Sequence, residues 1–267
     1  MNQLRDSSEQ LIGEIRLFAF DFAPDGWLPC EGQIVPNNEE NKLLFSVIGT
    51  QFGGDGQTTF GLPDLNLNSN FNLARESASP GAVPMRDKGI HYCIAVQGER
   101  EAANYFYTGQ INFFPYATMF SEFENNWLPC DGRMLNIASN SSLFSRIGNK
   151  FGGDGRINFA LPNLPGGGDH YGFCKYYICL GGMREKNSYL GQIDFYPYAN
   201  PDPDWMACDG KMLNIASHQE LFSLIGNKFG GDGESNFALP DLRGAEPLWN
   251  CGFFYIRVYG KYPTKSQ

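Results

Sequence analysis

The chain has 267 residues and a formal net charge of −9, and 42% of its residues are hydrophobic. The acidic balance argues against nucleic acid as a partner, because phosphate binding requires clustered lysine and arginine. No segment approaches the roughly 18 consecutive apolar residues of a membrane-spanning helix, so membrane insertion is not expected.

Two motifs recur three times in the same order along the chain. The first, Trp-x-x-Cys followed by an acidic residue and glycine, starts at Trp27, Trp127 and Trp205. The second, FGGDG followed closely by Phe-x-Leu-Pro, starts at Phe52, Phe151 and Phe229. Three matches in register indicate an internal repeat. We therefore expect three β-rich modules of the α+β class, spanning residues 1–103, 104–187 and 188–267.

Each module is expected to begin and end with a β-strand. The opening strands are predicted in apolar runs at residues 12–20, 108–114 and 190–196. The closing strands are predicted in alternating runs at residues 92–98, 176–182 and 254–260. In the last run, Tyr255, Arg257 and Tyr259 alternate with Ile256 and Val258, which is typical of a half-buried strand. Trp-x-x-Cys is expected to form a turn after the opening strand.

A short helix is predicted between the two motifs of each module. In the third module Ser217 is the expected N-cap, Glu220 completes a capping box, and Gly226 ends the helix. Ser139 and Gly148 are expected to do the same in the second module.

The FGGDG segments are expected to form turns. Their glycines allow positive φ, and their aspartate side chains can accept hydrogen bonds from nearby backbone amides. The first module also carries a polar insertion at about residues 66–89, rich in serine, asparagine and proline. We expect this insertion to be a long surface loop and the first choice for a binding surface.

In its first module the chain resembles the phage tail collar domain. The resemblance rests on GEIRLFA at residues 13–19, on Cys-Glu-Gly-Gln at residues 30–33, on FGGDG and on Leu-Pro-Asp-Leu at residues 62–65. The other modules diverge, with Gly-Gln-Ile at residues 109–111 and 191–193 in place of Gly-Glu-Ile. The same signature defines the microcystin-dependent protein family, a name that implies no microcystin chemistry.

The resemblance implies a non-enzymatic structural or adhesion protein at the tip of a phage tail fibre or bacterial surface appendage. Its implied partners are fibre, tail or pilus subunits and cell-surface glycans or receptors. Because collar proteins usually act as trimers, three fused copies could fold into a monomer with pseudo-threefold symmetry. A linear array of modules is the alternative.

Two other functions stay open: an assembly cap or adaptor without ligand binding, and a polysaccharide-degrading enzyme that uses the recurrent carboxylates. The expected location is the virion or an extracellular appendage. Residues 1–10 lack the apolar core of a secretory signal, so export without a classical signal peptide is expected.

Exposed aromatic rings could stack on sugars, although aromatics at strand spacing also pack in cores and between modules. The candidates for ligand binding are Tyr105, Tyr107, Phe195 and Tyr198. The recurrent tryptophans, cysteines and aspartates are interpreted as structural: Trp27, Cys30, Asp55, Trp127, Cys130, Asp154, Trp205, Cys208 and Asp232. The cysteines are expected to be small buried thiols. No metal site is predicted, because the three histidines share no repeat position. No catalytic residue or cofactor is predicted either, because carboxylates that recur in every repeat are more simply explained by folding.

Overall fold

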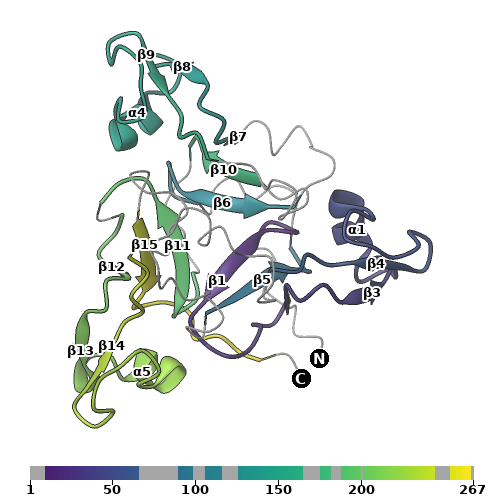
Figure 1. Ribbon diagram of the computed structural model, residues 1–267, viewed down its shortest axis with the longest axis vertical. Helices are drawn as coiled ribbons and strands as arrows, with labels where there is room; N and C mark the ends of the chain where they lie inside the picture. The colour runs from purple at the N-terminus through teal and green to yellow at the C-terminus, as the bar shows by residue number, and fades with distance from the viewer. Residues whose placement is uncertain are drawn as a thin grey trace, which may run out of the picture.

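The computed structural model of the protein describes residues 10–65, 90–98, 106–115, 126–164, 175–181, 188–199, 201–243 and 253–265. The predicted loop at residues 66–89 lies outside these ranges. Three arms project from a shared centre, one arm from each module (Figure 1). Each arm holds one short helix and one two-stranded sheet, and the centre holds nine strands that form a single sheet.

Each module contributes an opening strand, a short strand at its Trp-x-x-Cys motif and a closing strand to the central sheet. In the first module these are β1 (Ile15–Phe18), β2 (Trp27–Pro29) and β5 (His91–Ala95). In the second they are β6 (Ile111–Phe114), β7 (Trp127–Pro129) and β10 (Lys175–Cys179). In the third they are β11 (Gln192–Tyr196), β12 (Trp205–Ala207) and β15 (Phe253–Arg257). The closing strand lies between the other two and pairs antiparallel with both.

The opening strands join the modules to one another. β1 pairs with β6, β6 with β11, and β11 with β1, each time antiparallel. The register is the same at each of the three junctions. The isoleucine of one opening strand faces a residue of the following opening strand, two places after the isoleucine of that strand. The paired residues are Ile15 with Phe113, Ile111 with Phe195, and Ile193 with Leu17. The three pairings therefore close on themselves.

The residue before FGGDG links each arm to the following module. Gln51 donates a hydrogen bond to the carbonyl of Pro115, and Lys150 donates to the carbonyl of Pro197, over 3.0 and 3.3 Å. In the third arm Lys228 forms an ion pair with Asp21 of the first module, over 2.5 Å. These contacts run in the same cyclic order as the strand pairings.

All three arms contain the predicted short helix and, in addition, a small sheet that was not predicted. The strands of their small sheets are β3 (Ile34–Pro36) with β4 (Thr59–Gly61), β8 (Met134–Asn136) with β9 (Asn158–Ala160), and β13 (Met212–Asn214) with β14 (Asn236–Ala238). The helices are α1 (Lys42–Ile48), α4 (Ser141–Ile147) and α5 (Gln219–Ile225), and the one-turn helix η2 (Ile215–Ser217) precedes α5. No helix in the described ranges is long and apolar enough to cross a membrane, since each α-helix has only seven residues.

The predicted helix ends are right at one terminus and wrong at the other. Gly148 and Gly226 end their helices with φ near 58°, and each donates its N–H to a carbonyl four residues earlier. The N-caps, however, are Asn140 and His218 instead of the serines one residue before them. Ser217 belongs to η2, so no capping box with Glu220 forms.

Two expectations about strands are also corrected. The Trp-x-x-Cys segment is a strand and not a turn, because its backbone pairs with the closing strand. The closing strand β15 is buried on both sides after its exposed first residue, Phe253, since Tyr255, Ile256 and Arg257 are all buried. Tyr259, beyond its end, is exposed. Arg257 tolerates burial because its guanidinium stacks 5.4 Å from the Trp205 ring and bonds to Asp204 over 3.2 Å.

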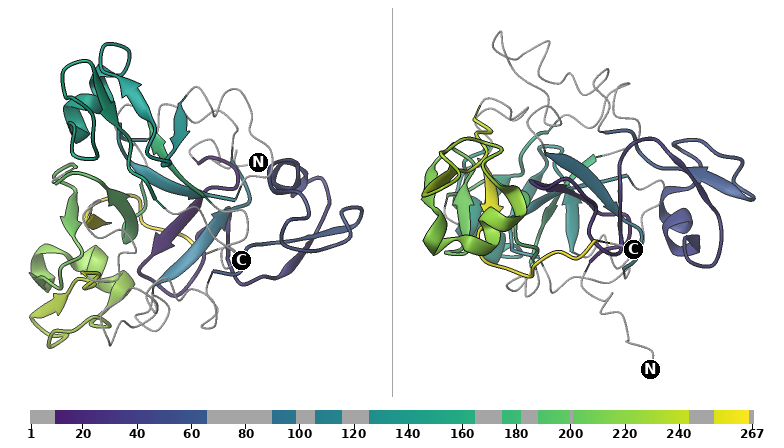
Figure 2. Two further views of the ribbon diagram at one scale, coloured as in Figure 1. Left: turned by 45° about the horizontal axis from the view of Figure 1, so that its top comes forward. Right: turned by 90° about the horizontal axis from the view of Figure 1, so that it is seen from below.

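The last described segment of the chain returns to the first module. The Asp25 N–H donates to the Thr264 carbonyl over 2.8 Å, and Pro24 forms an isolated β-bridge with Lys265. The yellow end of the ribbon accordingly runs back from the third module towards the first (Figure 2).

Candidate functional site

Buried polar side chains meet where the three opening strands converge. Each module supplies two of them, an outer residue just before or at the start of its strand and an inner residue two places later. The outer residues are Glu14, Gln110 and Gln192, and the inner residues are Arg16, Asn112 and Asp194. None of the six is more than 6% exposed. We call these six residues the polar ring.

Hydrogen bonds run through the polar ring in a closed circuit. Within each module the outer and inner side chains bond to each other: Arg16 to Glu14, Gln110 to Asn112 over 3.0 Å, and Gln192 to Asp194 over 2.9 Å. Between modules the bonds are Arg16 to Gln192 over 2.8 Å, Gln110 to Asp194 over 2.9 Å, and Asn112 to Glu14 over 3.5 Å. Each inner side chain thus touches the outer side chain of another module, in one cyclic order.

The outer residues are also tied to their own backbone. The side chains of Glu14, Gln110 and Gln192 each accept a hydrogen bond, over 3.0 to 3.1 Å, from the N–H three residues earlier. An outer residue therefore needs a long side chain with an acceptor oxygen, which glutamate and glutamine both provide. This requirement explains why Glu14 can be replaced by glutamine in the other two modules.

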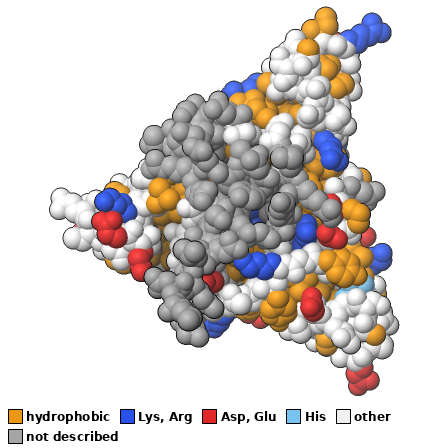
Figure 3. Space-filling model, turned by 180° about the vertical axis from the view of Figure 1, so that it is seen from behind, with side chains coloured by type: hydrophobic (Ala, Val, Ile, Leu, Met, Phe, Trp, Pro, Cys, Tyr) orange, Lys and Arg blue, Asp and Glu red, His pale blue; other side chains and the backbone are white. Residues whose placement is uncertain are grey.

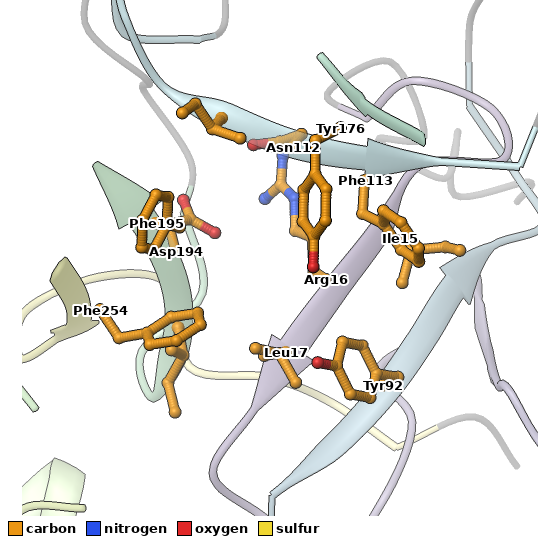
Figure 4. A pocket seen from close by; sticks show the side chains of 12 residues that line it. Ile15, Arg16, Leu17, Tyr92, Asn112, Phe113, Tyr176, Asp194, Phe195 and Phe254 are labelled. Atoms are coloured by element: carbon orange, nitrogen blue, oxygen red, sulfur yellow. The ribbon is translucent and has the colours of Figure 1, made fainter. Parts of the chain in front are cut away.

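A small cavity with a volume of about 50 Å³ lies against the inner residues (Figure 4). Each module lines it with the same four positions, three from the opening strand and one from the closing strand. In the first module these are Ile15, Arg16, Leu17 and Tyr92. Most of the wall is apolar, and the inner residues of the polar ring also line the cavity.

The aromatic residues predicted to bind ligand contribute to packing in the described structure. Tyr107 is buried, with its ring 6.0 Å from that of Tyr196, and Phe195 is buried against Phe254 and lines the cavity. Tyr198 is half-buried, and its hydroxyl donates to the Thr108 carbonyl over 3.0 Å, which joins the third module to the second. Burial also raises the pKa of Tyr198 well above its usual value. Tyr105 lies outside the described ranges, and glycan binding by these residues stays a prediction.

The aspartates of the FGGDG motifs hold turns, as expected. One carboxylate oxygen of Asp55, Asp154 and Asp232 accepts hydrogen bonds from three successive backbone N–H groups, over 2.7 to 3.0 Å. Hydroxyl donors, from Thr58 to Asp55 and from Ser235 to Asp232, add to these bonds. The bonds lower the pKa of all three carboxyl groups below the ordinary value of 3.8. All three carboxylates are exposed and engaged in their own turns.

The recurrent cysteines are buried, as predicted, and they carry free thiols. Each lies between the central sheet and its arm, where its carbonyl accepts a hydrogen bond from a leucine N–H over 2.8 to 2.9 Å. The pairs are Cys30 with Leu65, Cys130 with Leu164, and Cys208 with Leu242. Within the described ranges, no group of three or more histidine, cysteine, aspartate or glutamate side chains could hold a metal ion.

The polar ring was not predicted, although a signal for it is present in the sequence. Each opening strand carries two polar residues two places apart within an apolar run, and they occupy equivalent positions in all three modules. Polar residues with period two on a strand share one face of it. The pattern by itself is typical of a strand with its polar face in solvent, and the burial of this face follows from the pairing of the three opening strands.

The Phage Tail Collar Domain family model matches the chain three times, at residues 13–69, 109–167 and 191–247. The chain belongs to this family. Each collar match begins at the glycine just before an outer residue of the polar ring and extends through the whole arm. The closing strands, which complete the central sheet, lie beyond the matched residues. No curated protein and no solved structure matches the chain significantly.

Membership of the collar family identifies the chain as a phage tail structural protein associated with the virion. The family is structural and not enzymatic. The three collar copies coincide with the three arms and with the strands that carry the polar ring.

Proposed function

We propose that this chain is a single-chain equivalent of a collar trimer, placed at the tip of a tail fibre or similar appendage, where it contacts the cell surface. The observation that carries the proposal is the mutual pairing of β1, β6 and β11 in one repeated register. In a homotrimer such a junction would be formed by three identical strands from separate chains. Here one chain supplies all three, so pseudo-threefold assembly is intramolecular.

Fusion has a functional consequence for a tip protein. A homotrimer presents three identical faces, whereas three fused modules can diverge and present a feature once only. The polar ring has diverged in this way, with arginine, asparagine and aspartate at its inner positions. A feature that occurs in one module, such as the insertion at residues 66–89, can then contact a receptor without being repeated.

One observation favours a second candidate, an adaptor that attaches to a threefold fibre. The first residue of the small sheet in each arm is a large apolar side chain that is about half exposed. These residues are Ile34, Met134 and Met212, with exposed fractions of 54%, 52% and 50%. Hydrophobic side chains are visible on all three arms in Figure 3. Equivalent exposed apolar side chains on three arms suit a partner that repeats the same contact three times.

The test uses the whole particle and the purified chain together. Immunogold labelling with an antibody against this chain is expected to mark the distal ends of fibres or tails. The purified protein, which we expect to elute with the mass of one chain in light scattering, should reduce adsorption of the particle to cells in a dose-dependent manner.

The two candidates differ in this pair of measurements. Label on the particle without competition for adsorption would favour the adaptor and count against surface contact. Label confined to free protein, or a trimer of full-length chains in solution, would contradict the proposed function.

A further inference from the structure

The ends of the three arms carry different charges. The residue after FGGDG is Gln57 in the first arm, Arg156 in the second and Glu234 in the third, and all three are exposed. Figure 3 shows a basic side chain at the end of the second arm, at the top of the view, and acidic side chains at the end of the third arm, at the lower right. We propose that the second arm binds an acidic polysaccharide of the cell surface. This binding rests on the proposed contact with the cell surface, for which it names an arm and a ligand class.

The second arm is basic although the chain as a whole is acidic. Residues 131–164, from the end of its Trp-x-x-Cys motif to the leucine of Leu-Pro-Asn-Leu, include four basic and two acidic side chains. The equivalent residues 31–65 of the first arm include one basic and five acidic side chains, and residues 209–242 of the third arm include two basic and five acidic ones. An anionic polymer is therefore attracted to the second arm and repelled by the other two.

Both acidic side chains of the second arm are engaged within it. Asp131 forms an ion pair with Arg133 over 2.5 Å, and one carboxylate oxygen of Asp154 accepts three N–H groups of its own turn. Two further arginines, Arg146 on α4 and Arg156 at the tip, have exposed side chains. An external anion can therefore reach both guanidinium groups.

Arg146 lies beside an aromatic ring of the third module. Its guanidinium carbon is 5.6 Å from the centre of the Tyr198 ring. This contact restricts a long side chain, so less conformational entropy is lost when the guanidinium binds an anion. The equivalent helix positions of the other arms hold Val47 and Leu224, which carry no charge.

The ligand class follows from the extent of the basic surface and from its apolar neighbour. Ile157 follows Arg156 and is 65% exposed, so the C–H groups of a sugar ring can contact it while a carboxylate or phosphate binds the arginine. Duplex DNA carries one negative charge per about 1.7 Å of its axis and needs a more extended basic surface than one arm between two acidic ones. A flexible sugar chain with more widely spaced anionic groups suits the second arm better.

Binding of defined polymers to the full-length chain at equal ionic strength, measured by calorimetry, tests the ligand class. Polygalacturonate supplies carboxylates and a phosphorylated mannan supplies phosphates, while methyl-esterified polygalacturonate and plain mannan lack these charges. At least one charged polymer is expected to bind at least about tenfold more tightly than its uncharged form, and less tightly as salt rises. Which of the two binds identifies the anionic group. Equal binding of the charged and uncharged forms, no binding of either charged polymer, or tighter binding of duplex DNA would overturn the proposal.

Variants locate the binding on the second arm. Arg156→Gln and Arg146→Leu introduce the residues that other modules have at these positions, Gln57 and Leu224, so the fold should accept both. Each variant is expected to weaken binding of the charged polymer about two- to fivefold. The matched control, Lys42→Gln, removes one positive charge from an exposed residue of the first arm and should leave the affinity unchanged. An equal loss in the control, or unchanged affinity in both arginine variants, would refute the site.

Competition for adsorption of the particle to cells distinguishes failure of this site from failure of the proposed function. The wild type is expected to compete more strongly than the two arginine variants. Equal competition by all three would mean that the chain contacts the cell surface without the second arm, which contradicts the site alone. Binding of polygalacturonate or phosphorylated mannan without any competition would instead contradict the proposed function and support the second arm as a surface for anionic polymers.

Discussion

In each FGGDG turn, one aspartate side chain accepts hydrogen bonds from three successive backbone N–H groups. Asp154 shows this without a hydroxyl donor, because its bonds over 2.7 to 3.0 Å come from the amides of residues 156–158. Those amides lower the pKa of its carboxyl group below 3.8. The charged form is therefore favoured in the folded state.

We predict that Asp154→Ala lowers the urea midpoint of unfolding at neutral pH. Because the folded pKa of Asp154 lies below its unfolded value, its contribution to stability is complete above the unfolded pKa and is lost as pH falls through the folded pKa. The difference in midpoint between the wild type and the variant should be constant above about pH 5 and shrink below about pH 4. Glu40→Ala, at an exposed residue in the first arm, is the control and should show neither effect. A pH-independent difference for Asp154→Ala would contradict the role of charge.

At the scale of the arm, the glycines of FGGDG serve two separate needs, positive φ and close backbone approach. Gly153 has φ of 94°, and a Cβ there would lie 2.5 Å from Phe159 Cα and 2.6 Å from the carbonyl oxygen of Asn158. Gly148, at the end of α4, has φ of 58° but nothing within 4 Å of a Cβ. A comparison of Gly148 with Gly153 therefore distinguishes the cost of positive φ from the cost of a steric clash.

We predict that Gly148→Ala destabilises the protein by about 1 to 3 kcal/mol, because φ of 58° with ψ of −149° lies in a region that is essentially restricted to glycine. Gly153→Ala should cost clearly more, because the backbone of β9 must move to admit the methyl group. Denaturant titration followed by tryptophan fluorescence measures both free energies of unfolding. Equal losses would show that φ alone decides both positions.

The sequence predicted elements best where local chemistry decides them. The FGGDG turns and the glycine helix ends follow from φ and from side-chain acceptors within four residues. The N-caps were misplaced by one residue; in the third module this is because Ser217 belongs to η2, so that α5 begins only after His218. The Trp-x-x-Cys strand and the double burial of β15 could not be predicted, because both depend on strands far away in the chain.

At the scale of the whole molecule, the polar ring depends on contacts between residues up to 176 positions apart, such as Arg16 with Gln192. Its residue types are visible in the sequence, but their partners are set only when the three opening strands pair. The ring is also the point where the three modules differ chemically. A homotrimer of the third module would bring three Asp194 carboxylates together, and like charges at this distance repel. In the fused chain, the single Asp194 carboxylate instead accepts hydrogen bonds from the side-chain amides of Gln110 and Gln192.

This arrangement leads to a prediction about the pair Glu14 and Arg16. Arg16→Asn removes the partner of a buried carboxylate, and such a loss costs about 3 to 5 kcal/mol of stability. The double variant Glu14→Gln with Arg16→Asn instead reproduces the neutral pair that the second module has as Gln110 and Asn112. The outer glutamine can still accept the backbone N–H at position 11, as Gln110 does at position 107. We therefore expect the double variant to recover most of the stability lost in Arg16→Asn.

A double-mutant cycle on free energies of unfolding measures this coupling between positions 14 and 16. A coupling energy above about 2 kcal/mol is expected for a buried ion pair of this kind. Two additive effects would mean that the ring does not act as a connected network. Because the polar ring lies on the opening strands, whose pairing joins the three modules, loss of the network should also appear as separation of the modules. Limited proteolysis should then cut Arg16→Asn faster than the double variant, and the same rate for both would argue that the ring does not hold the modules together.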